Sequence, residues 1–249
     1  LSVILAALLP IAINVLTSCT SKTKEKEKEK EEEEEKFEPK VYDLPCFYIA
    51  TAGKKPITSK EEYINCDITI NNTKEEYKLS NDSGKIRGRG NSTWKQEKKP
   101  YKLKFDESTD LFGNGSAKTW TLIANHFDPT LIKNYLAYSV CNEFASQPYT
   151  TSLEFVDLYL NNEYQGVYAV CEQIEAHKNR VNIKTSWGEP QDMNYLIELD
   201  NRLRLEHETG LNIFSSESNY YKIHYPDVED TEYTQDFTDY VKNYFQDCY

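Results

Sequence analysis

Apolar and polar residues alternate along this chain in short runs, a pattern that is typical of half-buried β-strands. The clearest run is Pro100–Phe105, whose three apolar side chains fall on one face while Lys102 and Lys104 fall on the other. Similar runs predict strands at Pro45–Ala50, Cys66–Ile70, Glu75–Leu79, Lys85–Arg89, Trp120–Ala124, Phe155–Leu160, Tyr164–Ile174 and Asn194–Asp200, with one more ending at His224-Tyr225.

Two segments have helical spacing instead. Asp128-Pro129 predicts a helix start, because Asp is a common N-cap and Pro suits the first turn, and the periodicity continues to about Ala145. Thr234–Tyr244 carries its apolar residues on one stripe and predicts a second helix. Strands joined by hairpins, with a helix between them, predict an α+β fold with a mainly antiparallel sheet.

The first forty residues differ from the rest. Leu1–Ser18 is apolar without a charged residue, and its Leu-Thr-Ser end before Cys19 resembles a bacterial lipobox. This predicts a lipoprotein signal peptide over 1–18, lipidation of Cys19 and an extracytoplasmic protein anchored to the bacterial cell membrane. A transmembrane anchor or an ordinary signal peptide is the alternative. The Glu- and Lys-rich residues 19–40 predict a disordered tether, which leaves 41–249 as the folded domain.

Charge is distributed unevenly along the chain. The net charge is −12, yet the twenty residues Ile86–Phe105 hold seven Lys or Arg and one acid, Glu97. A cationic cluster inside an acidic protein favours a site for a specific anion, with phosphate the leading candidate, and argues against nucleic acid as a partner. The alternative is a solvated strand face that happens to be basic.

Five blocks between Lys85 and Asp200 resemble the CotH family, the spore-coat protein H-like proteins regarded as atypical secreted protein kinases. In order they are RGRGNSTW, KKPYKLKF, TLIANHFDPTLIKNYLAY, FVDLYLNNEYQGVYAVCEQIE and NYLIELD. The resemblance implies a kinase-like N-lobe with one packed helix. It also implies ATP with Mg or Mn as cofactors, and transfer of the γ-phosphoryl group to Ser or Thr of a protein substrate.

The resemblance also suggests which residues hold the nucleotide: Arg87, Arg89, Lys102, Lys104 and Glu172. Lys102 would hold the α- and β-phosphates by analogy with kinase-like lobes. Glu172 would lie at or beside the cleft, where it could pair with a basic residue or contact the ribose or adenine. Ordinary ion pairs are the alternative for Glu172 and for both arginines.

Each of the further candidate residues could have either a binding role or an ordinary structural role. Glu198 and Asp200 share a strand face and could hold Mg²⁺, or could pair with Arg202 or Arg180. Asn91 and Ser92, in the basic loop, could lie at the site or only shape a turn. Lys133 and Asn134, early in the first predicted helix, could contact phosphate or only lie on the surface. Glu143, later in that helix, could mimic the kinase Lys–Glu pair.

The sequence also departs from kinase patterns. Gly88 and Gly90 fit a G-x-G-x-x-G loop, but Thr93 stands in its third glycine position, and there is no H-R-D or D-F-G segment. The W-D-x-D type segment of the family is missing from Asn201–Tyr249. We therefore expect an incomplete C-terminal lobe, leave the catalytic residues unassigned and expect little activity of this chain alone. Alternative functions are a non-catalytic surface adhesion or envelope scaffold module and, because of the nineteen tyrosines, a carbohydrate-associated protein.

Overall fold

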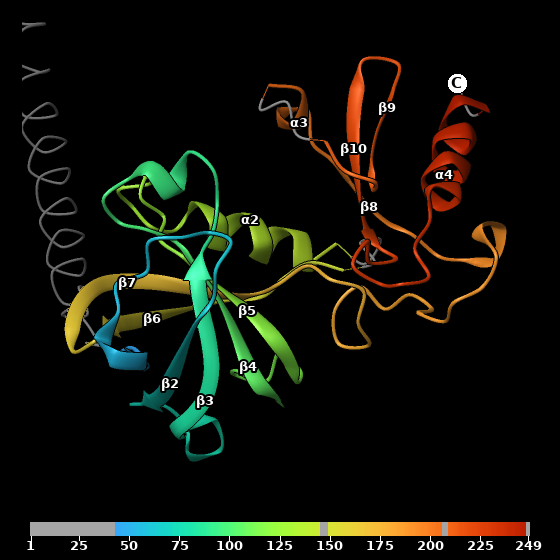
Figure 1. The fold of residues 1–249 in the computed structure, drawn as a ribbon. Coiled ribbons are helices and arrows are strands. Elements are labelled where there is room, and N and C mark those ends of the chain that lie inside the picture. The colour runs from blue at the N-terminus through green and yellow to red at the C-terminus, as the bar shows by residue number, and fades with distance from the viewer. Residues whose placement is uncertain (1–42, 145–148, 206–208, 248–249) are drawn as a thin grey trace, which may run out of the picture. The chain divides into compact units, whose positions relative to one another are not determined.

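The computed structural model describes residues 43–144, 149–205 and 209–247 (Figure 1). From Leu44 onward the chain forms one compact unit. The predicted signal peptide, the predicted tether and Cys19 lie outside the described residues. None of the helices that the structure describes has the length and apolar character needed to span a membrane.

Seven strands form a closed β-barrel in the order β1-β2-β3-β4-β5-β7-β6. All neighbouring strands pair in antiparallel fashion except β1 and β6, whose parallel pairing closes the barrel. The strands are β1 Cys46–Thr51, β2 Ile64–Asn71, β3 Leu79–Gly88, β4 Tyr101–Thr109, β5 Ala117–Ile123, β6 Leu153–Leu160 and β7 Glu163–Glu172.

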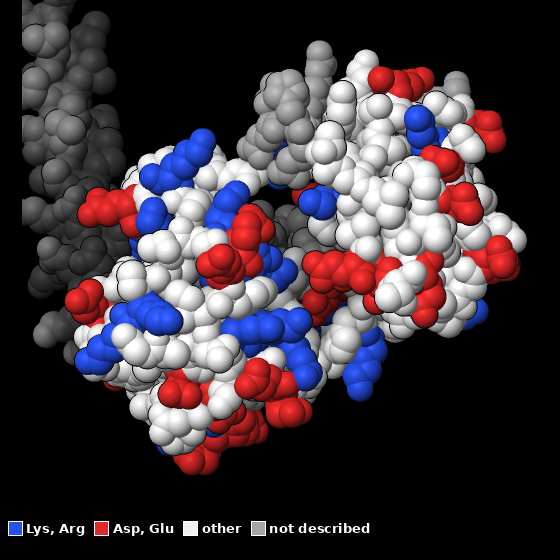
Figure 2. All heavy atoms as spheres, in the orientation of Figure 1, with Lys and Arg blue, Asp and Glu red and all other residues white. Residues whose placement is uncertain are grey.

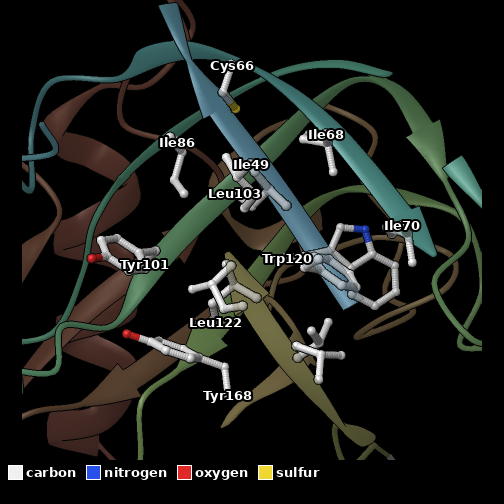
Figure 3. Close-up of a cluster of buried hydrophobic side chains, with 14 of the residues drawn as sticks. Ile49, Cys66, Ile68, Ile70, Ile86, Tyr101, Leu103, Trp120, Leu122 and Tyr168 are labelled. Carbon is white, nitrogen blue, oxygen red and sulfur yellow. The ribbon is translucent and has the colours of Figure 1, made fainter. Parts of the chain in front are cut away.

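The alternating pattern explains the barrel interior. The apolar residues of β4 that the sequence places on one face, Tyr101, Leu103 and Phe105, are all buried. They join inward residues of the other strands, such as Ile86 and Trp120, in one core. Figure 3 shows Ile86, Tyr101, Leu103 and Trp120 pointing toward one another inside the barrel. Removing so many apolar side chains from water is the main force that holds the strands together.

A second, smaller sheet follows the barrel in the chain. Its strands β8 Leu196–Leu199, β9 Ile213–Ser216 and β10 Asn219–Tyr225 lie in the order β8-β10-β9. Helix α4, Gln235–Asp247, buries Phe237 and Val241 in a separate core with residues of this sheet. The turn of helix α3, Arg202–Leu205, follows β8.

Short helices complete the described chain. Helix α2, Lys133–Asn142, lies between β5 and β6 in sequence and runs along the outside of the barrel (Figure 1), and it contains no buried residue. The 3₁₀ turns are η1 Ala52–Lys54, η2 Glu75–Tyr77, η3 Thr93–Lys95 and η4 Pro190–Asp192.

The expected α+β fold with a kinase-like N-lobe is wrong. The described residues form mostly sheet, in a closed seven-stranded barrel, and only α2 and α4 are helices longer than one turn. The helix in this region, α2, contacts the barrel through Tyr138 but contains no buried residue. Antiparallel pairing was expected correctly, but closure depends on β1 meeting β6 more than a hundred residues later, which local periodicity does not reveal.

Several element boundaries also differ from the expectations. Glu75–Leu79 is not a strand: a 3₁₀ turn covers Glu75–Tyr77, and one continuous strand runs from Leu79 to Gly88. The first helix begins at Lys133, not at Asp128. Strand β9 has four residues and was not predicted, since so short a run has little periodicity.

Candidate anion-binding site

Cations face one another across strands β3 and β4. The register pairs Arg87 with Lys102 and Lys85 with Lys104, on the outward face of the barrel. Like charges directly opposite on neighbouring strands repel each other, so this arrangement costs stability unless an anion binds or each cation finds another partner. Figure 2 shows Lys and Arg gathered over the barrel on the face in view, among patches of Asp and Glu.

Arg87 has partners within the protein. Its Nη1 atom donates a hydrogen bond to the Lys60 carbonyl and lies 3.8 Å from Oε2 of Glu61. The guanidinium carbon also lies 4.9 Å from the ring centroid of Tyr63. Of the two readings of the sequence for Arg87, this geometry fits the structural pair.

Arg89 is different. It follows β3 directly, and its backbone N–H donates to the Pro100 carbonyl at 3.2 Å, which fixes its position against the start of β4. Burial lowers the pKa of its guanidinium. Within the described parts of the chain, no hydrogen bond or ion pair engages the side chain. Arg89 lines three cavities, of about 400, 280 and 230 Å³.

Lys102 lines the smallest of these cavities together with Arg87 and Arg89. Burial lowers the pKa of its ammonium, and the positive charge of Arg87 lowers it further, while Glu175 acts in the opposite direction. Lys102 and Arg89 are therefore two partly desolvated cations close to each other. Such a pair gains most from an anion that can accept hydrogen bonds from both.

Glu175 is the acid that interacts electrostatically with Lys102, and the sequence reasoning missed it. Burial raises the pKa of its carboxyl, against the attraction of Arg180 and Lys102. It lies just after β7, in the EQIE block that was used for the resemblance. The resemblance pointed to the first acid of this block, Glu172. The sequence alone does not show which of Glu172 and Glu175 lies near Lys102.

Glu172 is buried and satisfied by its neighbours. Its Oε2 atom accepts a hydrogen bond from Oγ1 of Thr151 at 2.8 Å and another from the backbone N–H of Ser152. Its Oε1 atom lies 4.0 Å from Nη1 of Arg180. The carboxylate also lines the 400 Å³ cavity. The contacts are those of a structural ion pair, and the nucleotide role suggested for Glu172 remains a prediction.

Arg180 lies over the end of the barrel core. Its side chain is fully buried, with the guanidinium carbon 4.5 Å from the Trp120 ring centroid. Nη1 donates to the carbonyls of Asn114 and Asn179 at 3.0 and 2.8 Å. Nε and Nη2 have no hydrogen-bond partner among the described residues. Arg180 thus joins the β4–β5 loop to the segment that carries Glu175.

The carboxylates proposed for metal binding have protein partners. Oε2 of Glu198 lies 2.7 Å from Nε2 of His224, and Asp200 accepts bonds from Nε and Nη2 of Arg202 at 2.7 and 2.6 Å. These hydrogen bonds lower the pKa of each carboxyl. No group of three or more metal-ligating side chains occurs in the described part of the chain. The geometry fits the ion-pair alternative, although Glu198 and His224 also line the 400 Å³ cavity.

The sequence matches the family described as CotH kinase protein over residues 86–249, more than half of the chain. This chain belongs to the CotH kinase family. It matches no curated protein.

The CotH match covers every candidate residue of the site. Arg89, Lys102 and Glu175 lie inside it, as do Glu198 and His224. The match begins at Ile86, within β3, so β1 and β2 lie before it although they complete the barrel. The site residues therefore all lie within the CotH match, whereas the barrel that carries them also includes strands that precede the match.

The first turn of α2 is closed by an acid. Oδ2 of Asp128 accepts a hydrogen bond from the Lys133 backbone N–H at 2.9 Å, so Asp128 caps the helix although it stands five residues before it. Nζ of Lys133 lies 3.9 Å from Oδ1 of the same residue. Nδ2 of Asn134 donates to Oδ1 of Asn125 at 2.7 Å. Both residues suggested as phosphate contacts from this helix thus have protein partners.

The remaining candidates have minor roles in the described structure. Glu143 is exposed, and no ion pair within the described ranges involves it, so the geometry offers no kinase-like Lys–Glu pair there. Oδ1 of Asn91 accepts from Nζ of Lys60 at 3.3 Å, and Ser92 is exposed. Lys104 lies on the cationic face, further along β4 than Lys102.

Proposed function

We propose that the face bearing Arg89 and Lys102 binds the phosphate groups of ATP, and that the protein in its complete form transfers the γ-phosphoryl group to Ser or Thr of a protein substrate. The observation that carries this proposal is Arg89, a partly buried guanidinium that makes no hydrogen bond or ion pair with a described residue and that lines three cavities. Membership of the CotH kinase family supports the same reading.

The chemistry of the site fits a polyphosphate. A guanidinium offers a planar fork of donors that matches two phosphate oxygens, and an ammonium adds a compact positive charge. Both cations are partly desolvated, so an anion would recover the energy lost on burial. The net charge of −12 disfavours large polyanions elsewhere on the surface. The site therefore suits one small, highly charged ligand.

The largest cavity suits the remainder of a nucleotide. Its volume, about 400 Å³, lies within the range of small-molecule sites. Ile123, Cys171 and Leu196 supply apolar lining for a flat base, and Thr121 and Gln173 supply polar groups at its edge. Arg89 also lines this cavity, so a base placed there would lie near the cations that hold the phosphates.

In this proposal Mg²⁺ or Mn²⁺ binds together with the nucleotide, and no protein side chain is assigned as a ligand of the metal ion. The described residues do not group three ligating side chains, and Glu198 and Asp200 are bonded to His224 and Arg202. Mg²⁺ often keeps waters and substrate phosphates as most of its ligands. In this proposal Arg89 and Lys102 hold and orient the phosphates, and Glu175 positions Lys102 through its charge.

Isothermal titration with ATP tests the site. Removing a charge-assisted hydrogen bond costs roughly 1.5–3 kcal/mol, so Arg89→Met and Lys102→Ala should each weaken binding by about ten- to a hundredfold. Lys118→Ala is the control, because Lys118 is exposed at the start of β5. Since no described residue accepts a bond from Arg89, Arg89→Met should not lower the melting temperature.

Two outcomes would count against the proposal. Equal ATP affinity in the wild type and both site variants would exclude Arg89 and Lys102 as phosphate contacts. No ATP binding at millimolar concentration, with or without Mg²⁺ or Mn²⁺, would favour the adhesion or scaffold alternative.

We also propose that the protein is exported and anchored to the cell membrane through lipid on Cys19. The support is the apolar Leu1–Ser18 run and the lipobox-like residues before the cysteine. Metabolic labelling of the protein with a fatty acid should mark the wild type and leave Cys19→Ala unmarked. Label that persists in the variant would refute the anchor.

A further inference from the structure

Helix α2 exposes a line of large apolar side chains. Ile132, Leu136, Val140 and Phe144 are 44%, 52%, 54% and 55% exposed, respectively. They recur every fourth residue, so they form one stripe along the helix and its two flanking residues. Tyr138, on the opposite side of the helix, packs against apolar residues of β6 and β7. The stripe therefore faces away from the barrel.

We propose that this stripe binds the same stripe of a second copy of the chain, with the two helices antiparallel about a twofold axis. A twofold contact brings identical surfaces together, so the surface must complement itself. The stripe meets this requirement in two independent ways, through its apolar residues and through the charges at its ends.

The apolar residues are arranged symmetrically about Tyr138. Leu136 and Val140 lie two residues to either side of it, and Ile132 and Phe144 lie six residues to either side. If two antiparallel helices meet at Tyr138, each residue of one helix faces the residue of the second copy that lies equally far on the other side of Tyr138. Leu136 then meets Val140 of the second copy, and Ile132 meets Phe144, so apolar side chains face each other along the whole stripe.

The charges follow the same symmetry. Lys133 and Glu143 flank the stripe five residues to either side of Tyr138, and no other charged residue lies between them. An antiparallel pair places each Lys133 against the Glu143 of the other copy, whereas a parallel pair would oppose identical charges. The Lys133 side chain is 73% exposed and contacts only Asp128, at 3.9 Å, among its described ion pairs. It therefore remains accessible to a second copy.

Overall charge points to the same surface. Two copies of a protein with net charge −12 repel each other over most approaches. The stripe carries one Lys and one Glu, so it offers contact without net repulsion. A ten-residue helix is only about 15 Å long. A helix pair of that length buries less than the roughly 1,200–2,000 Å² of a stable interface, so we expect a weak dimer with a micromolar dissociation constant.

Sedimentation velocity over a concentration series of the 249-residue chain tests the proposal. The wild type should shift from monomer to dimer, and Leu136→Glu should raise the dissociation constant at least about tenfold, since it buries two charges near the centre of the contact. Leu211→Glu is the matched control, because Leu211 is also exposed but lies in the segment before β9. It should dimerise as the wild type does. Circular dichroism should show all three proteins folded.

Charge exchange tests the antiparallel direction. Glu143→Lys opposes two lysines at each end and should weaken the dimer by about three- to tenfold. The double variant Lys133→Glu with Glu143→Lys restores opposite charges and should recover most of that loss. A monomeric wild type at concentrations of about 0.5 mM would overturn the proposal, as would a double variant weaker than Glu143→Lys. Vesicle binding that requires Leu136, without dimerisation, would overturn it in favour of a membrane contact.

Discussion

Burial acts on all three charged side chains that form the centre of the candidate site. It lowers the pKa of Arg89 and Lys102 and raises the pKa of Glu175. Each shift means that the folded protein disfavours the charged form relative to water. Groups that are held in this way and lack a hydrogen-bonded partner are typical of sites that bind a charged ligand.

The raised pKa of Glu175 gives a test by pH. Burial disfavours its charged form in the folded state relative to the unfolded chain, so its contribution to stability is fully present below the ordinary carboxyl pKa and is lost as pH rises through the raised value. Glu175→Gln, which stays neutral, should therefore be more stable than the wild type at pH 8, and the difference should disappear as pH falls to about 4.

Urea unfolding of both proteins between about pH 4 and pH 8 measures this difference. Glu62→Gln, at an exposed position before β2, is the control and should show no such change. A Glu175→Gln variant that is less stable at neutral pH would mean that attraction to Lys102 and Arg180 outweighs the cost of burial.

At the scale of single residues, the sequence predicted which cations belong to the candidate site but not which residues contact them. The concentration of basic residues within an acidic chain predicted an anion site that includes Arg89 and Lys102. The sequence could not tell that Arg87 is tied to the segment around Lys60 and Glu61, whereas Arg89 is not. Nor could it tell that Glu175 interacts with Lys102. These facts depend on how distant segments fold against β3 and β4.

At the scale of elements, Arg89 is positioned by the end of β3 and the loop that follows it. Gly88 donates its N–H to the Ser59 carbonyl at 2.8 Å. A Cβ atom at this residue would meet the Trp94 ring at 2.5 Å. Trp94 thus packs directly on the strand end, and Nζ of Lys99 lies 4.8 Å from the centroid of the Trp94 ring. The loop is fastened on both sides of Arg89.

Alternation predicted most strands, because a half-buried strand must repeat every two residues. It failed where local geometry changes within an element. Residue Asn81 has a positive φ of 57° near the start of β3, and the register with β2 shifts between Ile68 and Ile70. The sequence therefore predicted only the last part of β3, Lys85–Arg89, and placed a strand over the 3₁₀ turn at Glu75–Tyr77. The Asp128 cap acts from five residues before α2, so the sequence placed the helix start too early.

At the scale of the whole molecule, topology was the feature that the sequence did not reveal. The parallel pairing of residues 46–49 with 157–160 closes the barrel, and no local pattern encodes a contact over that distance. The family resemblance was confirmed, but it led to a kinase-like N-lobe that the barrel contradicts. Function is carried by sites and not by folds, so a correct family did not guarantee the expected architecture.

The central claim is that Arg89 and Lys102 hold the phosphates of a nucleotide. The most direct measurement is a crystal structure of the protein soaked with a non-hydrolysable ATP analogue and Mg²⁺. We expect phosphate oxygens within about 3 Å of the Arg89 guanidinium and the Lys102 ammonium, and the base in the 400 Å³ cavity. Nucleotide bound at another surface, with Arg89 and Lys102 both free of it, would contradict the claim.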